Sequence, residues 1–558
     1  MMFLSDIEIA QSNPMTHIKN IAHKLYLDED NLEMYGNYKA KLPLDLIDED
    51  KIEKSNLILV TAITPTPAGE GKTTVSIGLS EGMNFIGKQS TVVLREPSLG
   101  PVFGIKGGAA GGGCSQVVPM EDINLHFTGD FNAIEKANNL LSALIDNNLQ
   151  SRTKSLDIDP RTILWKRVID MNDRALRNII VGLGGTANGI PREDGFNITP
   201  ASEVMAILCM AKDFEDLKER LGNIFIGYTF DKKPVFAKDL KAQNAMAILL
   251  KDAIKPNLVQ TLEKNPAIIH GGPFANIAQG TNSIIATKMA MSLSDYVITE
   301  AGFGADLGAE KFLNIKAAYA GLNPKAVVLV ATIRALKHHG GVDKEEYNAP
   351  DLEAVKKGFC NLEKHIENIR KFNLTPIVAI NSFVSDTMEE QDYIIQKCKT
   401  LGIEAVVSKS WQMGGEGNIE LAKAVTEIVD SNNDSYKPLY QWDDPVKAKV
   451  EIIARSIYGA IAVDYSPLAN QKLKKIKELG FENFAVCMAK TQTSFSDNPK
   501  LTGRPEGFHI TVRDIEIAAG AKFIIPILGS MMRMPGLPET PASEGMQIDE
   551  NGIISGLS

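Results

Sequence analysis

The sequence predicts an α/β fold in which a doubly wound, mainly parallel sheet carries a phosphate-binding loop. Short runs of β-branched and apolar residues recur along the 558-residue chain, and helical patterns separate them. Strands that are apolar on both faces and alternate with helices are typical of parallel sheets covered on both sides. The first run, residues 56–61, stops at a Pro/Gly loop that leads into an amphipathic segment starting at Lys72. This order of strand, glycine loop and helix is the setting in which phosphate-binding loops occur.

The loop after the first strand has the residue types that a nucleotide site needs. It reads Thr66-Pro67-Ala68-Gly69-Glu70-Gly71-Lys72-Thr73, with Thr66 where the phosphate-loop pattern usually begins with glycine. Gly69 and Gly71 let backbone N–H groups turn toward phosphate oxygens, and the helix N-terminus adds a positive dipole. We expect Lys72 to contact the β- and γ-phosphates and the Thr73 hydroxyl to bind Mg²⁺. A surface turn that contains Gly-Lys-Thr is the alternative, which the flanking strand and helix disfavour.

Further strands are expected at residues 90–94, 178–181, 267–269, 296–299, 326–331, 376–380 and 405–407. Thr199 followed by Pro200 predicts a helix start. Ligands of such sheets bind beyond the carboxyl ends of the strands, so the residues that follow each run are candidates for function. These following segments begin at Arg95, Gly182, His270, Glu300, Thr332, Asn381 and Lys409, and many of them are rich in glycine.

Arg95 and Glu96 come directly after the second strand. An arginine at this position can hold a carboxylate or an acyl phosphate in a bidentate manner. If the second strand pairs beside the first, both residues lie next to the phosphate loop. A purely structural Arg–Glu pair at the end of the sheet is an equally good interpretation.

Aromatic residues follow three of the later strands: Phe303, Phe383 and Trp411. An aromatic side chain at the ligand-binding edge can stack on a flat heterocycle, although any one of them alone is more often part of a core. Arg334 and Lys337 are interpreted as residues that face an anion. The adjacent histidines that follow Lys337 point apart on a helix or strand and are interpreted as non-ligands of metal.

Residues 104–114 form a second distinctive segment, with six glycines in its first ten positions. Glycine removes side-chain bulk and allows positive φ, so the main chain can wrap closely around a ligand. Flexible linkers usually carry serine or charged residues instead of Ala and Ile, which favours an ordered functional loop.

The composition excludes several classes of protein. Charged residues make up 23 % and hydrophobic residues 44 % of the chain, as in ordinary soluble proteins. The net charge of −10 disfavours a nucleic-acid binder. The five cysteines are widely spaced, without a C-x-x-C motif, and favour reduced thiols over disulfides or zinc. Neither a targeting peptide nor a membrane-spanning stretch is recognisable, so we expect a cytoplasmic protein.

Changes in composition predict three domains. Residues 1–350 are expected to form the nucleotide-binding phosphate-loop α/β domain, and residues 351–455 a smaller α/β domain. Residues 456–558 are expected to form a C-terminal α+β domain with strands at 485–488, 509–512 and 523–527.

Together these motifs resemble the formate–tetrahydrofolate ligase family, also called formyltetrahydrofolate synthetases, over essentially the full length of the chain. The resemblance rests on residues 66–74, 95–101, 104–113, 300–310, 330–341 and 409–411. Thr66 in place of glycine is the family's own variant. Cys114 is a departure, because the family's glycine run usually ends in tyrosine.

The resemblance implies an ATP-dependent ligase that joins formate to N10 of tetrahydrofolate, giving 10-formyltetrahydrofolate, ADP and phosphate through formyl phosphate. It also implies a three-domain subunit in a homotetramer, with Mg²⁺ and a monovalent cation, K⁺ or NH₄⁺, as activators. The folate can carry a polyglutamate tail, and neither nucleic acid nor membrane is an expected partner. Since the chain has no room for the dehydrogenase and cyclohydrolase modules of some relatives, we expect the monofunctional form.

By family likeness, the loop from Thr66 to Thr73 matches the nucleotide site, with Lys72 in a catalytic role. Arg95 matches the formyl phosphate contact, with Glu96 beside it. Phe383 and Trp411 match the pair that sandwiches the pterin ring, with Phe303 nearby.

Two other functions remain open from the sequence. Another ligase that forms an acyl phosphate, such as one closing a ring on a diamine, would keep the phosphate loop and Arg95 without needing the aromatic residues. An ATP-dependent switch or metal-delivery protein would need a cysteine pair, which the sequence lacks. A binding module with an inactive phosphate loop is disfavoured by the intact Lys72 and Thr73.

Overall fold

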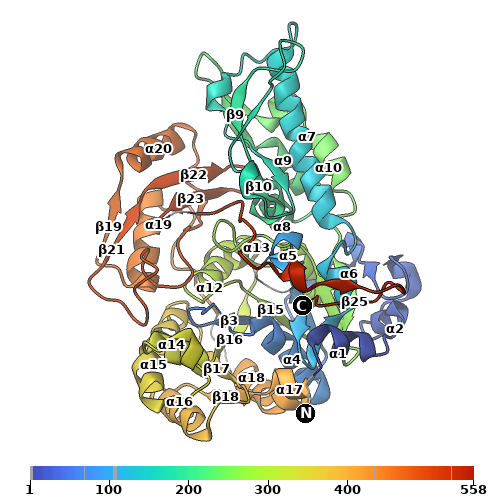
Figure 1. The fold of residues 1–558 in the computed structure, drawn as a ribbon, viewed down its shortest axis with the longest axis vertical. Helices are drawn as coiled ribbons and strands as arrows, with labels where there is room; N and C mark the ends of the chain where they lie inside the picture. Colours follow the sequence, from blue (N-terminus) through green and yellow to red (C-terminus); the bar gives the residue numbers. More distant parts are fainter. Residues whose placement is uncertain are drawn as a thin grey trace.

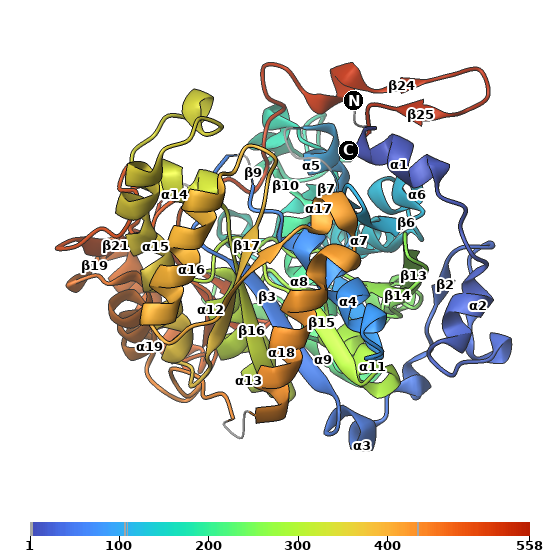
Figure 2. The ribbon, with the colours of Figure 1, turned by 90° about the horizontal axis from the view of Figure 1, so that it is seen from below.

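A computed structural model describes residues 4–67, 69–104, 108, 110–431, 435–529 and 531–557. Its centre is a large, mainly parallel sheet with helices on both faces (Figure 1, Figure 2). The strand order along the sheet is β1-β2-β13-β14-β4-β15-β3-β16-β17-β18. The predicted α/β class with a mainly parallel sheet is therefore confirmed.

The parallel part of the sheet contains the strands predicted from the buried apolar runs. It consists of β14 (Pro266–Ile269), β4 (Ser90–Leu94), β15 (Tyr296–Glu300), β3 (Asn56–Ala62), β16 (Pro324–Ala331), β17 (Pro376–Asn381) and β18 (Ala405–Ser408). One edge continues in antiparallel strands: β13 (Asn257–Thr261), β2 (Ala40–Lys41) and β1 (Glu33–Met34), with β6 (Ser115–Val118) also on β13 and β5 (Gly111–Gly112) on β6.

Two apolar layers cover the sheet because successive side chains of each strand point to opposite faces. Ile58 and Val60 of β3 pack with α4 (Lys72–Phe85) and α18 (Ile419–Ser431), which lie side by side in Figure 2. Leu57 and Leu59 pack into the opposite layer. That layer includes α11 (Ile284–Leu293), α14 (Ile333–His339) and α15 (Leu352–Arg370).

The sheet region contains further, mostly short helices. They are α1 (Asp6–Ser12), α2 (Ile18–His23), α3 (Glu49–Ile52), α5 (Leu99–Phe103), α6 (Met120–Asn124), α12 (Gly308–Lys311), α13 (Ala318–Ala320), α16 (Met388–Thr400) and α17 (Ser410–Met413).

A lobe between β6 and β13 extends from the sheet, at the top of Figure 1. It contains α7 (Asp130–Gln150), β7 (Arg167–Ile169), β8 (Ile179–Val181), β9 (Arg192–Asp194), β10 (Phe196–Ile198), α8 (Glu203–Met210), α9 (Phe214–Gly222), β11 (Phe225–Tyr228), β12 (Pro234–Phe236) and α10 (Gln243–Leu249).

Two predictions for this lobe are wrong. The run at 178–181 forms β8, which pairs antiparallel with β9 in a separate hairpin, and Ile180 is 61 % exposed. A short apolar run does not by itself distinguish a buried parallel strand from an exposed hairpin. Gly182 therefore lies in a hairpin turn, away from the edge of the main sheet. Thr199 begins a 3₁₀ turn, and Ser202 caps the helix α8 instead, its Oγ accepting from Met205 N at 3.1 Å.

Most of the C-terminal region packs beside the sheet, on the left of Figure 1, while its last two strands lie on the opposite side, near α1 and α6. It contains α19 (Val446–Ile452), β19 (Ala462–Tyr465), α20 (Pro467–Glu478), β20 (Ala485–Val486), β21 (His509–Val512), β22 (Asp514–Ala518), β23 (Phe523–Ile527), β24 (Gln547–Ile548) and β25 (Ile554–Ser555). The strands predicted here are present as β20, β21 and β23. Because β17 and β18 extend the main sheet, the three-domain division stays a prediction.

Among the described residues, no helix combines the length and apolar character needed to cross a membrane.

Candidate functional site

The loop predicted to bind phosphate connects β3 to α4 at the carboxyl edge of the sheet. Gly69 and Gly71 both adopt positive φ, 77° and 70°, which glycine allows without strain. Gly71 is the N-cap of α4, and Lys72 and Thr73 form its first turn. Ala68 lies outside the described residues, as do residues 105–107 and 109 of the glycine-rich segment. The observed strand, loop and helix match the predicted order.

The loop is held in shape by its own Glu70. This buried carboxylate accepts hydrogen bonds from Thr66 N at 2.8 Å and Thr66 Oγ1 at 3.0 Å. Its other oxygen accepts from Thr332 Oγ1 at 2.5 Å, at the end of β16. Asn381 Nδ2, at the end of β17, donates to Glu70 O at 3.1 Å. The Glu70 side chain thus holds the loop in shape. Only the backbone of Glu70 is left to contact a nucleotide.

A buried polar network fixes the chain where it leaves β3. Thr64 N donates to Asn361 Oδ1 at 3.3 Å, and Thr64 Oγ1 lies 2.9 Å from His365 Nε2. Thr64 O lies 3.0 Å from His339 Nε2. Burial lowers the pKa of His339 to about 4 and that of His365 to about 3. Both imidazoles are therefore neutral near pH 7 and act as hydrogen-bonding partners of the segment that precedes the loop.

Glu300 links the loop to the predicted anion-binding arginine. Its side chain, 3 % exposed at the end of β15, accepts from Thr73 Oγ1 at 2.8 Å through Oε2. Its Oε1 lies 4.0 Å from Arg95 Nε at the end of β4. These contacts connect three residues in one continuous line: Thr73 in the first turn of α4, Glu300 at the end of β15 and Arg95 after β4. The hydroxyl and the carboxylate are hard oxygen donors of the kind that Mg²⁺ prefers.

The sheet order corrects one expectation about Arg95. The second strand, β4, does not pair beside the first strand, because β15 lies between β3 and β4. Arg95 therefore approaches the loop across the end of β15, and Glu300 fills the space between them.

Glu96 lies in a different environment from Arg95. Its side chain is buried, and its backbone N–H donates to Gly271 O at 2.9 Å. Burial first, and then the charge of Asp130, raise the pKa of Glu96 well above its usual range. Glu96 therefore holds its proton more strongly than a solvent-exposed carboxyl group does.

Phe383 and Trp411 follow neighbouring strands at the same edge. Asn381 and Ser408 are register partners on β17 and β18, so the segments that carry the two aromatic residues start side by side. Phe383 is half-buried, and the Arg334 guanidinium carbon lies 4.0 Å from the centroid of its ring. The Arg334 guanidinium thus lies against the face of the Phe383 ring at the carboxyl edge of the sheet.

Trp411 belongs to α17 and packs against the glycine-rich segment. Its carbonyl accepts from Cys114 N at 2.9 Å. A Cβ added at Gly113 would lie 2.7 Å from Trp411 Cγ and would clash with Trp411 O. The described end of the glycine run is thus an ordered surface against which Trp411 rests. Cys114, where the resembled family usually has tyrosine, is exposed, and its thiol donates to Gln412 O at 3.3 Å.

Phe303 lies in the turn that follows Glu300. Its φ of 59° is unusual for a bulky residue and marks a conformation imposed by its surroundings. Its neighbour Gly302 donates to Gly280 O at 2.9 Å, and a Cβ there would lie 3.0 Å from Arg95 Nη1. The Phe303 turn and Arg95 therefore share one corner of the edge.

The prediction that Lys337 faces an anion is wrong. Its ammonium is buried, pairs with Glu390 Oε1 at 2.7 Å and donates to Ala349 O at 2.8 Å. Lys337 is on the inner face of α14, which a sequence run of basic residues does not reveal. His338 lies 2.7 Å from Tyr347 OH through Nδ1. Within the described part of the chain, no group of three or more His, Cys, Asp or Glu residues could hold a metal.

Glu300, Thr332 and Asn381 were recognised in the sequence only as residues at strand ends. Their roles depend on which strands become neighbours, and a single sequence gives no signal for that order. The structure places all three at hydrogen-bonding distance from the 66–73 loop.

A comparison with protein families gives an independent finding. The family model described as formate–tetrahydrofolate ligase matches residues 4–558 of the chain.

The geometry of the loop predicts that Gly71→Ala weakens ATP binding more than Gly69→Ala does. Both glycines have positive φ, which costs alanine about 1–2 kcal/mol. A methyl group at Gly71 would also clash with Asn381 Nδ2, whereas no described residue other than its chain neighbours lies within 4 Å of a methyl group at Gly69. Isothermal titration calorimetry of each variant with ATP should show the larger loss for Gly71→Ala. Equal ATP affinity in both variants would contradict this account of the loop.

Proposed function

Because the chain belongs to the formate–tetrahydrofolate ligase family, we propose that it carries out the ligation through formyl phosphate at the carboxyl edge of the central sheet. The family's activity is the ATP-dependent ligation of formate to tetrahydrofolate in one-carbon metabolism. The observation that supports this site best is the line from Thr73 through Glu300 to Arg95. It connects the loop suited to ATP with the arginine suited to formate.

The chemistry requires formate to be activated before it reacts. Formate is a carboxylate at neutral pH and therefore a poor electrophile. In the first step a formate oxygen attacks the γ-phosphorus of ATP, ADP leaves, and formyl phosphate forms. In the second step N10 of tetrahydrofolate attacks the formyl carbon, phosphate leaves with the former formate oxygen, and N10 loses a proton. The site must stabilise phosphoryl charge and exclude water.

The loop residues suit the first step. Lys72, at the start of α4, would contact the β- and γ-phosphates, and backbone N–H groups of the loop would surround the phosphate chain. Thr73 and Glu300 would hold Mg²⁺, which supplies positive charge to the phosphate oxygens when bound. Thr73 is already oriented by its 2.8 Å hydrogen bond to Glu300. This orientation reduces the reorganisation needed when nucleotide binds.

Arg95 suits the acyl end of the reaction. Its guanidinium can bind the two formate oxygens and then the formyl phosphate with its planar pair of donors. Glu300, 4.0 Å away, restrains the side chain. Glu96, whose pKa is raised by burial, adds a buried carboxyl group at the same strand end.

Phe383 and Trp411 form the proposed pterin clamp, with Phe303 nearby. They come from adjacent strand ends, and their rings can stack on the two faces of a flat heterocycle. Arg334, against the Phe383 ring, would lie beside the bound folate.

Several wider properties complete the proposal. We expect activation by K⁺ or NH₄⁺, assembly as a homotetramer and a cytoplasmic location. The domain boundaries near residues 350 and 455 also belong to the proposal.

The formyl phosphate intermediate predicts a transfer of oxygen. When [¹⁸O]formate, ATP and tetrahydrofolate react on the protein, one ¹⁸O should appear in the inorganic phosphate, because phosphate leaves with the oxygen that attacked the γ-phosphorus. Mass spectrometry of the phosphate measures this label, and a reaction without tetrahydrofolate serves as the control. Unlabelled phosphate from a reaction that makes 10-formyltetrahydrofolate would exclude the intermediate.

Arg95→Lys is expected to lower formate-dependent ATP consumption by roughly 10²–10³-fold, because an ammonium lacks the planar fork of donors. The KM for formate should rise, while ATP affinity stays close to that of the wild type. Arg370→Lys is a matched control, since Arg370 is on α15 and donates to Leu401 O. If the folded Arg95→Lys variant keeps the wild-type kcat and formate KM, Arg95 serves only as a structural partner of Glu300.

Trp411→Ala is expected to weaken tetrahydrofolate binding about tenfold or more, since stacking contributes roughly 1–3 kcal/mol per face. ATP binding should change little, because Trp411 lies outside the 66–73 loop. Fluorescence and calorimetric titrations with each ligand measure the two affinities, with the exposed Phe230→Ala as a control. An unchanged affinity for tetrahydrofolate, or an equal loss of affinity for ATP, would contradict the clamp. Trp411 would then serve only in packing, as it does against Gly113.

A further inference from the structure

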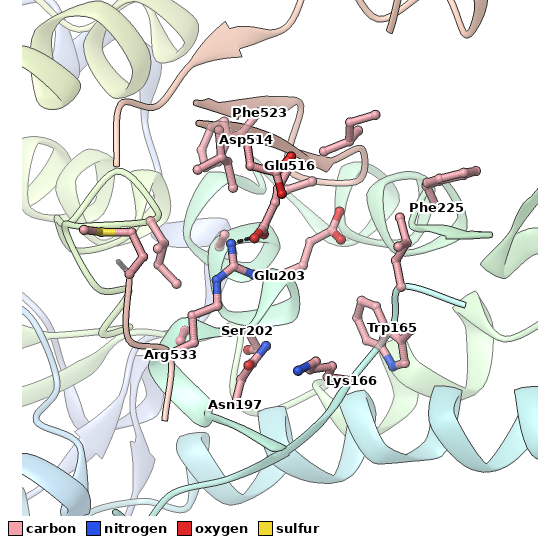
Figure 3. A pocket seen from close by; sticks show the side chains of 18 of the residues that line it. Trp165, Lys166, Asn197, Ser202, Glu203, Phe225, Asp514, Glu516, Phe523 and Arg533 are labelled. Atoms are coloured by element: carbon pink, nitrogen blue, oxygen red, sulfur yellow. Dashed lines mark ion pairs between the residues drawn. The ribbon is translucent and has the colours of Figure 1, made fainter. Parts of the chain in front are cut away.

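A cavity of about 850 Å³ lies between the lobe and the C-terminal region. Figure 3 shows Trp165, Lys166, Asn197, Ser202 and Glu203 of the lobe facing Arg533 and Glu516. The residues that line it do not include Lys72, Arg95, Phe383 or Trp411, so it is separate from the proposed active site.

The cavity wall also reaches toward the sheet. Ile277 and Ala278 line the cavity, and two residues later Gly280 O accepts from Gly302 N at 2.9 Å. An occupant of the cavity would therefore contact the segment 277–280. That segment is hydrogen-bonded to the Phe303 turn, which borders Arg95.

Positive charge predominates in this cavity, although the whole chain has a net charge of −10. The cationic residues that line it are Arg161, Lys166, Arg177, Lys472, Lys475 and Arg533, and the carboxylate residues are Glu203, Asp514 and Glu516.

Two of the carboxylates are already neutralised. Asp514 pairs with Lys472 at 2.7 Å, and Glu516 pairs with Arg533. Burial raises the pKa of the third, Glu203, to about 7, so this carboxyl group is partly neutral near pH 7. Arg161 pairs with Asp159 at 2.7 Å, which leaves Lys166, Arg177 and Lys475 as the cavity cations without a salt bridge to a described carboxylate.

Lys166 is the strongest of these cations as a ligand-binding group. Its side chain is half-buried and points into the cavity near Asn197 (Figure 3). The Lys166 ammonium forms neither an ion pair nor a hydrogen bond with the described residues. Lys475 lies over the ring of Tyr228, 5.4 Å from its centroid, at the same cavity. A half-buried ammonium without a carboxylate partner favours an anionic occupant.

Aromatic and thioether side chains form the rest of the wall. The rings are those of Trp165, Phe196, Phe225, Tyr228 and Phe523, and the methionines are Met531, Met532 and Met534. Trp165 and Phe225 are almost fully buried, which fixes their positions. Flat rings and polarisable sulfur atoms both pack well against an aromatic ligand.

We propose that this cavity binds a small organic anion with a flat aromatic body. Its volume falls within the range of about 300–1,000 Å³ that is usual for small-molecule sites. The ring lies among Trp165, Phe225 and the methionines, and the anionic group binds to Lys166.

The test uses two dyes of similar shape on the full-length protein. 8-Anilinonaphthalene-1-sulfonate carries a negative charge, whereas N-phenyl-1-naphthylamine is neutral. Lys166→Glu should weaken binding of the anionic dye tenfold or more and change binding of the neutral dye less than twofold. Lys475→Glu should act in the same direction, and Lys154→Glu, on the exposed surface outside the cavity, should leave both affinities unchanged.

Fluorescence titration measures the affinities, and energy transfer from Trp165, compared with Trp165→Phe, locates the dye. Unchanged ATP-dependent turnover in Lys166→Glu verifies that the variant is folded. Three results would overturn the proposal: no binding of the anionic dye by the wild type, equal affinity in Lys166→Glu, or binding only after the oligomer is dissociated. The last result would mean that another copy of the chain fills the cavity.

Discussion

The parallel pairing of β3 with β15 on one side and β16 on the other determines where this protein can place its charges. Residues such as Val60, Ile298 and Val328 are fully buried, and helices cover both faces of the sheet. Unpaired charge cannot be accommodated inside such a sheet without a large desolvation cost. The polar residues are therefore collected where the strands end, and a line of hydrogen bonds and ion pairs forms along that edge.

The position of β15 between β3 and β4 gives that edge its particular chemistry. It puts the Glu300 carboxylate between the Thr73 hydroxyl and the Arg95 guanidinium. With β3 and β4 as direct neighbours, the loop and the arginine would meet without an intervening acid. The acid contacts both partners at once, so it links the 66–73 loop directly to the arginine proposed to hold formate.

Much of this architecture could be predicted from local sequence. Each strand of the parallel sheet is a short β-branched run, and the 66–73 loop carries its own glycine and lysine signature. The failures have one physical origin, which is that local patterns do not specify neighbours. The run at 178–181 became an exposed hairpin, Lys337 faces Glu390 inside the protein, and Glu300 gained its role only from the strand order. The cavity between the lobe and the C-terminal region could not be predicted either, because its walls come from segments that are far apart in the sequence, such as those of Lys166 and Arg533.

The helix that starts at Lys72 connects the proposed nucleotide and pterin sites through its small residues. A Cβ at Gly78 would lie 2.7 Å from Ser410 Oγ, and a Cβ at Gly82 would lie 3.0 Å from Asn418 O. Glycine at both positions lets the segment from α17 to Asn418 lie directly on α4. Trp411 is carried on that segment, and Gly113 makes room for its ring. Helix α4 begins in the 66–73 loop and contacts the segment that carries Trp411. The close backbone approach that glycine permits is therefore what joins the two proposed sites structurally.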